Sequence, residues 1–143
     1  MGVDFTMMAN PKYKGIPFHE LNEEDVKKCE KELEKDPSSK SLLDTVITED
    51  QFHYLKEITT FISELSSEYL SYSYCYIDTH NLRDVLQKIR EKIDELLHFS
   101  NRYHADTYGD HSDLYFWSTL YTKIQYFSEA FDANQWYILM VFV

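Results

Sequence analysis

The residue types best suited to chemistry gather in the segment 103–113, which contains two histidines and three aspartates. Imidazole nitrogen and carboxylate oxygen are the ligands of zinc and of harder divalent ions. A loop between two helices would aim these side chains at one ion, and the candidate ligands are His104, Asp106, Asp110, His111 and Asp113. Their spacing matches neither HExxH nor an EF-hand loop. The alternative is a solvated loop whose aspartates cap the following helix and favour its positive dipole end.

A second candidate site is the tyrosine-rich segment 69–77, YLSYSYCYI. Tyr is enriched at binding hot spots because it offers a large contact area and a hydrogen-bonding tip at small entropy cost. Tyr69, Tyr72, Tyr74 and Tyr76 either form an aromatic recognition surface, or each ring borders the core with its hydroxyl in water. The segment itself reads as a short strand or as the aromatic end of a helix.

Other catalytic chemistry has little support in the sequence. Asp78-Thr79-His80 could be an acid–base pair, but the start of a helix explains it more simply. Cys29 and Cys75 lie far apart and form no CxxC pair. With three glycines in the chain, there is no GxSxG motif and no phosphate-cradling loop. We therefore assign no catalytic residue and no cofactor.

Charge narrows the classes of partner. The chain carries 25 acidic and 14 basic residues, a net charge of −11. This disfavours direct nucleic-acid binding and anionic membranes, and it steers the protein toward basic partners. In the extreme, such a protein mimics a nucleic acid. The lysines interleaved with the carboxylates of residues 20–50 are more typical of a solvated acidic face.

The sequence predicts two strands and about four helices that would position these residues. Residues 3–8 alternate as a strand, and helices are expected over 22–36, from Thr48 to about 69–72, from Asp78 or Thr79 through Leu97, and from Asp110 or Ser112 to Asn134. The second helix has the clearest start, because Thr48 and Gln51 form a capping box. The last eight residues, 136–143, are an unbroken apolar run that predicts a buried strand.

The expected architecture is a single α+β domain over residues 1–143. About four helices would pack on a small sheet formed by the N-terminal and C-terminal strands. The terminal strand is apolar on both faces, so helices or a neighbouring chain should cover both. An open edge on this strand would allow two copies to pair.

The leading function is therefore a small, acidic, non-enzymatic protein of the cytoplasm that acts by binding another protein as a regulator or inhibitor. Self-association as a homodimer is the simplest choice of partner. The N-terminus lacks the basic-then-apolar order of a signal peptide, and no membrane contact is expected. The competing class is a metal-dependent hydrolase built on residues 104–113. A third is a ligand pocket lined by Trp117 and tyrosines.

Overall fold

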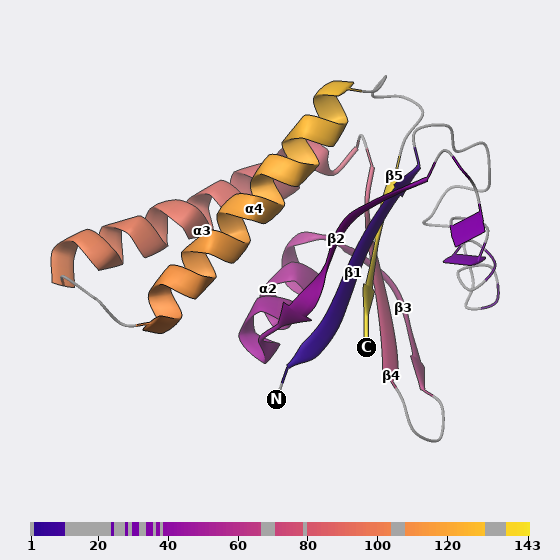
Figure 1. Cartoon of the computed structure of the whole chain (residues 1–143), viewed down its shortest axis with the longest axis horizontal. Helices are drawn as coiled ribbons and strands as arrows, with labels where there is room; N and C mark the ends of the chain where they lie inside the picture. The colour runs from indigo at the N-terminus through magenta and orange to yellow at the C-terminus, as the bar shows by residue number, and fades with distance from the viewer. Residues whose placement is uncertain are drawn as a thin grey trace.

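The computed structural model describes residues 2–10, 24, 28, 30–31, 34–35, 37, 39–66, 71–78, 80–103, 108–130 and 137–143. Within these ranges, the side chains of residues 10, 62–63, 65–66, 99–103, 108–112 and 137 are not described. The chain forms an α+β fold in which helices pack on an antiparallel sheet (Figure 1). The fold class predicted from the sequence is thus confirmed.

The sheet has five strands in the order β2-β1-β5-β4-β3. They are β1 (Val3–Asn10), β2 (Lys40–Ile47), β3 (Thr60–Ser66), β4 (Ser71–Ile77) and β5 (Tyr137–Phe142). The predicted pairing of the chain ends is present, because Phe5 lies opposite Phe142 and Met7 opposite Met140. The sheet is larger than the two terminal strands that the sequence identified, since three internal strands extend it on both sides.

β5 is the middle strand and is buried on both faces. Met140 and Phe142 belong to the main core together with helix residues, whereas Leu139 and Val141 alternate to the opposite face. Leu139 is fully buried and Val141 is 4% exposed. The expectation that both faces are covered is confirmed. Because β1 and β4 pair with its two edges, β5 cannot be the open edge that would join two copies.

Three helices have defined bounds among the described residues: α2 (Glu49–Ile58), α3 (Leu82–Tyr103) and α4 (Tyr108–Ala130). They lie on one side of the sheet, with α3 and α4 forming a hairpin (Figure 1). The count is slightly below the predicted four. The described residues of the predicted first helix, 24, 28, 30–31 and 34–35, are helical and lie on the other side of the sheet in Figure 1.

The predicted extent of the second helix is wrong. α2 ends at Ile58, and Thr59 takes an extended conformation while its hydroxyl and its N–H both donate to the Leu55 carbonyl. β3 begins at the next residue and contains a bulge between Phe61 and Ser63. The bulge interrupts the two-residue alternation, so the apolar residues of this strand recur at three- and four-residue spacing and imitate a helix.

Two helix starts complete the framework. Asp78 Oδ1 accepts hydrogen bonds from the backbone N–H groups of His80 and Asn81, at 2.8 and 3.2 Å. The interpretation of Asp78-Thr79-His80 as a helix start is therefore supported at Asp78. α4 already begins at Tyr108, so Asp110 and Ser112 lie within the helix rather than capping it.

Candidate functional site

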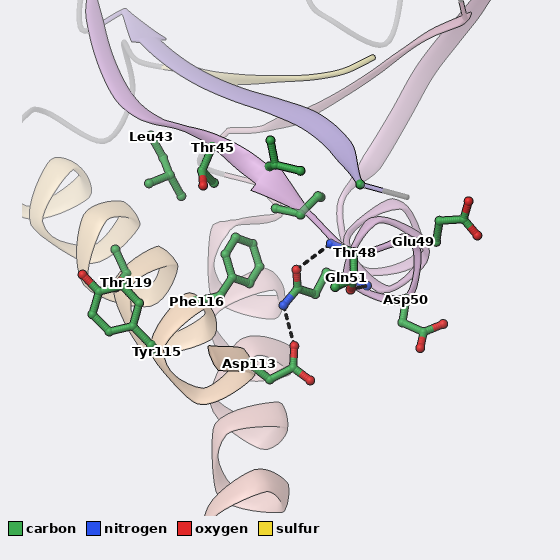
Figure 2. Close-up of a pocket in the computed structure, with 13 residues that line it drawn as sticks. Leu43, Thr45, Thr48, Glu49, Asp50, Gln51, Asp113, Tyr115, Phe116 and Thr119 are labelled. Carbon is green, nitrogen blue, oxygen red and sulfur yellow. Dashed lines mark hydrogen bonds between the residues drawn. The ribbon is translucent and has the colours of Figure 1, made fainter. Parts of the chain in front are cut away.

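An open groove of about 940 Å³ lies between β2, the start of α2 and the first half of α4 (Figure 2). Its lining comprises Gly2, Leu43, Thr45, Val46, Ile47, Thr48, Glu49, Asp50, Gln51, Asp113, Tyr115, Phe116 and Thr119. Leu43 and Phe116 supply apolar surface within it. In this groove Asp113, one of the predicted ion ligands, meets residues of α2 and β2.

The groove is held together by a hydrogen-bonded relay through Gln51. The Thr48 hydroxyl accepts from the Gln51 N–H at 3.1 Å, and Gln51 Oε1 accepts from the Thr48 N–H at 2.9 Å. This is the capping box expected from the sequence. Gln51 is 7% exposed, and its Nε2 also donates to Asp113 Oδ1. Gln51, which completes the capping box, thereby ties α2 to α4 across 62 residues of sequence.

The groove is anionic. Glu49, Asp50 and Asp113 contribute carboxylates, and the lining contains no Lys, Arg or His among the described residues. Glu49 and Asp50 occupy the first turn of α2, where the helix dipole favours negative charge. The side chains of Glu49 and Asp50 point outward from the helix start, away from Leu43 and Phe116, whereas Asp113 points at Gln51 (Figure 2).

One wall of the groove is the edge strand β2, which pairs with β1 on its inner side and is outermost in the sheet. Val46 on this strand is 63% exposed. Gly2 packs so closely here that an added Cβ would lie 2.1 Å from Val46 Cγ1. A glycine is therefore required at this position unless Val46 moves. The outer edge of such a strand carries backbone groups that can pair with an incoming chain.

The structure tests the predicted ion site at Asp113 alone. His104 and Asp106 lie outside the described residues, and Asp110 and His111 are placed only as backbone of α4. Asp113 is half-buried and bound to Gln51. The described residues contain no cluster of three metal-ligating side chains. A metal site formed by His104, Asp106, Asp110, His111 and Asp113 stays a prediction.

The tyrosine segment forms β4, which decides between the two structures considered for it. Tyr74 and Tyr76 are buried, at 2% and 7% exposed, and Tyr72 is half-buried. Tyr69 lies outside the described residues. The rings of Tyr74 and Tyr76 thus offer little free surface, and the recognition surface proposed for the four tyrosines stays a prediction.

Tyr74 is anchored by a carboxylate. Its hydroxyl donates to Glu30 Oε2 at 2.7 Å, which fixes a helical residue of the N-terminal half over β4. Burial, followed by this hydrogen bond and the charge of Glu30, raises the pKa of Tyr74 well above its ordinary value. Burial likewise raises the pKa of Tyr76, and the nearby charge of Asp78 adds to the effect.

Two further side chains bear on the sequence hypotheses. Cys75 is fully buried as a free thiol, and burial raises its pKa, which does not suit a nucleophile. Trp117 is 1% exposed and packs edge-on against Tyr54 at 5.2 Å. Its Nε1 is a buried donor without a hydrogen-bond partner in the described part of the chain. Trp117 is a core residue and does not line the groove.

Glu49 and Asp50 were not among the candidate site residues. The signal that could have identified them is their place directly after the capping residue Thr48, where carboxylates are common for purely structural reasons. Their meeting with β2 and α4 depends on tertiary packing, which sequence periodicity does not reveal.

Comparison of the chain with protein-family models, with curated proteins and with solved structures found no match. None of the helices in the described ranges is long and apolar enough to cross a bilayer.

Proposed function

We propose that this protein acts by binding another protein, and that the groove beside β2 receives an extended, basic segment of that partner. The observation that carries this proposal is the coincidence of three carboxylates with an outermost strand along one groove. A cytoplasmic location, expected from the sequence, remains part of the proposal.

Backbone pairing would supply affinity. A segment added alongside residues 41–47 of β2 would continue the sheet through backbone hydrogen bonds. Alternate side chains of that segment would face the groove, where Leu43 and Phe116 offer apolar contact. Strand addition of this kind needs no special sequence in the partner beyond an extended conformation.

Charge would supply selectivity. Glu49, Asp50 and Asp113 set a local negative potential, and the net charge of −11 reinforces it at long range. Lysine or arginine side chains on the incoming segment would be attracted during encounter and held beside the start of α2. Acidic segments would be repelled by the same groups. The metal-dependent hydrolase has no comparable support among the described residues.

The test uses a fluorescein-labelled peptide in which lysine alternates with valine, and a counterpart with glutamate in place of lysine. Fluorescence polarisation measures their binding to the full chain. We expect the basic peptide alone to bind, and its affinity to fall as salt rises because salt screens the charges. The double variant Glu49→Gln/Asp50→Asn should bind it about tenfold more weakly, since each contact removed contributes about 0.5–1 kcal/mol.

The matched control is Asp84→Asn/Glu91→Gln, which removes the same two charges from exposed positions on α3. Both double variants make the protein less negative by two charges, but this one leaves the groove unchanged. Equal loss of binding in the two double variants would show that total charge, and not the groove, attracts the peptide. Equal binding of the acidic and basic peptides would overturn the proposal entirely.

A further inference from the structure

One face of α4 carries a stripe of four residues, Tyr115, Thr119, Thr122 and Tyr126, which we call the α4 stripe; Thr119 is half-buried and the other three are exposed. Their spacing of four, three and four residues keeps them on one face of a helix. Tyr115 and Tyr126 are each 76% exposed, more than the other large hydrophobic side chains in the described ranges. Two such rings on one helix face form a surface suited to protein contact.

The stripe is poor in charge. None of the four stripe residues is charged, and Lys123 is the one charged side chain within residues 114–127. A solvated helix face in a protein of net charge −11 would normally carry carboxylates. Depletion of charge together with exposed tyrosine is the composition of the centre of a protein interface.

The stripe is also symmetric. Read in either direction, its order is Tyr, Thr, Thr, Tyr with the same spacing. A two-fold axis between positions 120 and 121 would lay two copies of α4 antiparallel. Tyr115 of each copy would then lie opposite Tyr126 of the other, and the threonines would meet at the centre. Self-complementarity of this kind is what an isologous dimer requires.

Charges agree with this register. The axis places Lys123 of one copy opposite Ser118 of the other, and no like charges face each other between positions 113 and 128. Four tyrosine rings would bury about 600 Å² at about 150 Å² each. Thr122 and the aliphatic part of Lys123 would add to this area, toward the roughly 1,000 Å² that a specific interface needs.

We therefore propose that the protein forms a two-fold dimer through the α4 stripe, with a second copy of this chain as the occupant. This goes beyond the proposed peptide groove. The two surfaces share Tyr115 and Thr119, whereas Tyr126 belongs to the stripe alone. Substitutions at Tyr126 therefore test the dimer without changing a residue of the groove.

Sedimentation equilibrium on the full chain tests the dimer. We expect a concentration-dependent mass approaching twice 17.1 kDa, with association tightened by salt because screening weakens repulsion between two acidic copies. Tyr126→Asp should weaken dimerisation by about a hundredfold or more, since a symmetric dimer loses the contact twice. The control Leu97→Gln changes another exposed apolar residue, 42% exposed on α3, and should leave the dimer intact.

The register is tested by complementation. Tyr115→Lys and Tyr126→Asp should each associate weakly alone, but their mixture should form a heterodimer in which the new charges pair and one tyrosine pair remains. Association of the mixture no tighter than that of either variant would overturn the antiparallel arrangement. A wild-type chain that remains monomeric at about 0.2 mM and about 0.5 M NaCl would overturn the dimer. If Tyr126→Asp still binds the basic peptide, the proposed peptide groove is supported whether or not the dimer forms.

Discussion

Replacing Gln51 by Glu isolates the contact that joins α2 to α4. Glutamate is as good a capping-box partner as glutamine, so the introduced carboxylate can still accept from the Thr48 N–H. The start of α2 is therefore preserved. The amide Nε2 that donates to Asp113 becomes an oxygen, however, and two carboxylates then face each other at a partly buried site.

The expected cost has two parts. Loss of a hydrogen bond to a charged acceptor costs about 1.5–3 kcal/mol. Two carboxylates about 4 Å apart repel by about 4 kcal/mol at an effective dielectric constant near 20. Asp113 is only half-buried, so rotation of its side chain toward water relieves much of the repulsion. We expect Gln51→Glu to lower the free energy of unfolding by about 2–4 kcal/mol at pH 7, a large share of a typical 5–15 kcal/mol.

The loss should depend on pH with a defined sign. Burial and the charge of Asp113 would raise the pKa of the introduced carboxyl above its unfolded value of about 4.3. The folded variant therefore binds a proton more tightly than the unfolded chain does. As pH falls through the raised pKa, the difference in stability from wild type should narrow. Urea unfolding of both proteins at pH 7.5 and at pH 5 measures this difference.

Gln87→Glu is the matched control. Gln87 is exposed on α3 and its side chain reaches Glu91 one turn later, so the substitution adds the same charge beside a carboxylate in water. It should cost less than about 0.5 kcal/mol. Adding Asp113→Asn to Gln51→Glu should recover most of the loss, because the donor and acceptor are then exchanged. An equal cost for the two glutamate variants, or no recovery in the double variant, would refute the relay.

Substitutions at three further positions test the framework by urea unfolding. Tyr74→Phe removes the donor to Glu30 and should cost about 1.5–3 kcal/mol at pH 8. Because the folded pKa of Tyr74 is raised, wild type should lose stability as pH rises above about 10, and the variant should lose less, which titration of the unfolding free energy checks. Met140→Ala, fully buried in the central strand, should cost about 2–5 kcal/mol. Trp117→Ala should cost about 3–5 kcal/mol, and Trp117→Phe less than half of that, since it also removes an unpaired buried donor.

Local signals in the sequence were sufficient for much of the fold. Alternation in β1, the unbroken apolar run of β5 and the Thr48–Gln51 capping box each correspond to what the structure shows. These features depend on a few neighbouring residues, so they can be recognised without knowing the rest of the chain. The pairing of β1 with β5 followed because few other partners were available to a doubly apolar strand.

Sheet order could not be obtained in the same way. β3 was assigned to a helix because its bulge removes the strand period, and no strand was predicted over the residues of β2. β4 was ambiguous because tyrosines suit a strand and a helix end equally well. Which strand lies at an edge is a property of the assembled sheet. An open edge on the terminal strand was considered only as a condition for self-association, whereas β2 and β3 are the outermost strands.

The candidate site shows the same division between local and tertiary information. Asp113 was selected as a metal ligand and Gln51 as a capping residue, each from its own neighbourhood. Their hydrogen bond joins positions 62 residues apart. Neither position indicates the other in a single sequence, and the groove between them exists only after α4 packs beside β2.

The two proposed surfaces share α4 but should respond to salt in opposite directions. A basic segment at Glu49 and Asp50 is attracted by charge, so added salt weakens it. Two copies of a chain of net charge −11 repel, and the α4 stripe binds through tyrosine, so added salt strengthens the dimer. Tyr115 lies at the border of the two surfaces, which means that the dimer places a second copy along the α4 wall of the groove. If both proposals hold, low salt favours the basic partner and high salt favours the dimer. As salt rises, the affinity for the basic peptide should fall while the affinity of dimerisation increases. A change of both affinities in the same direction would contradict the electrostatic basis of both proposals.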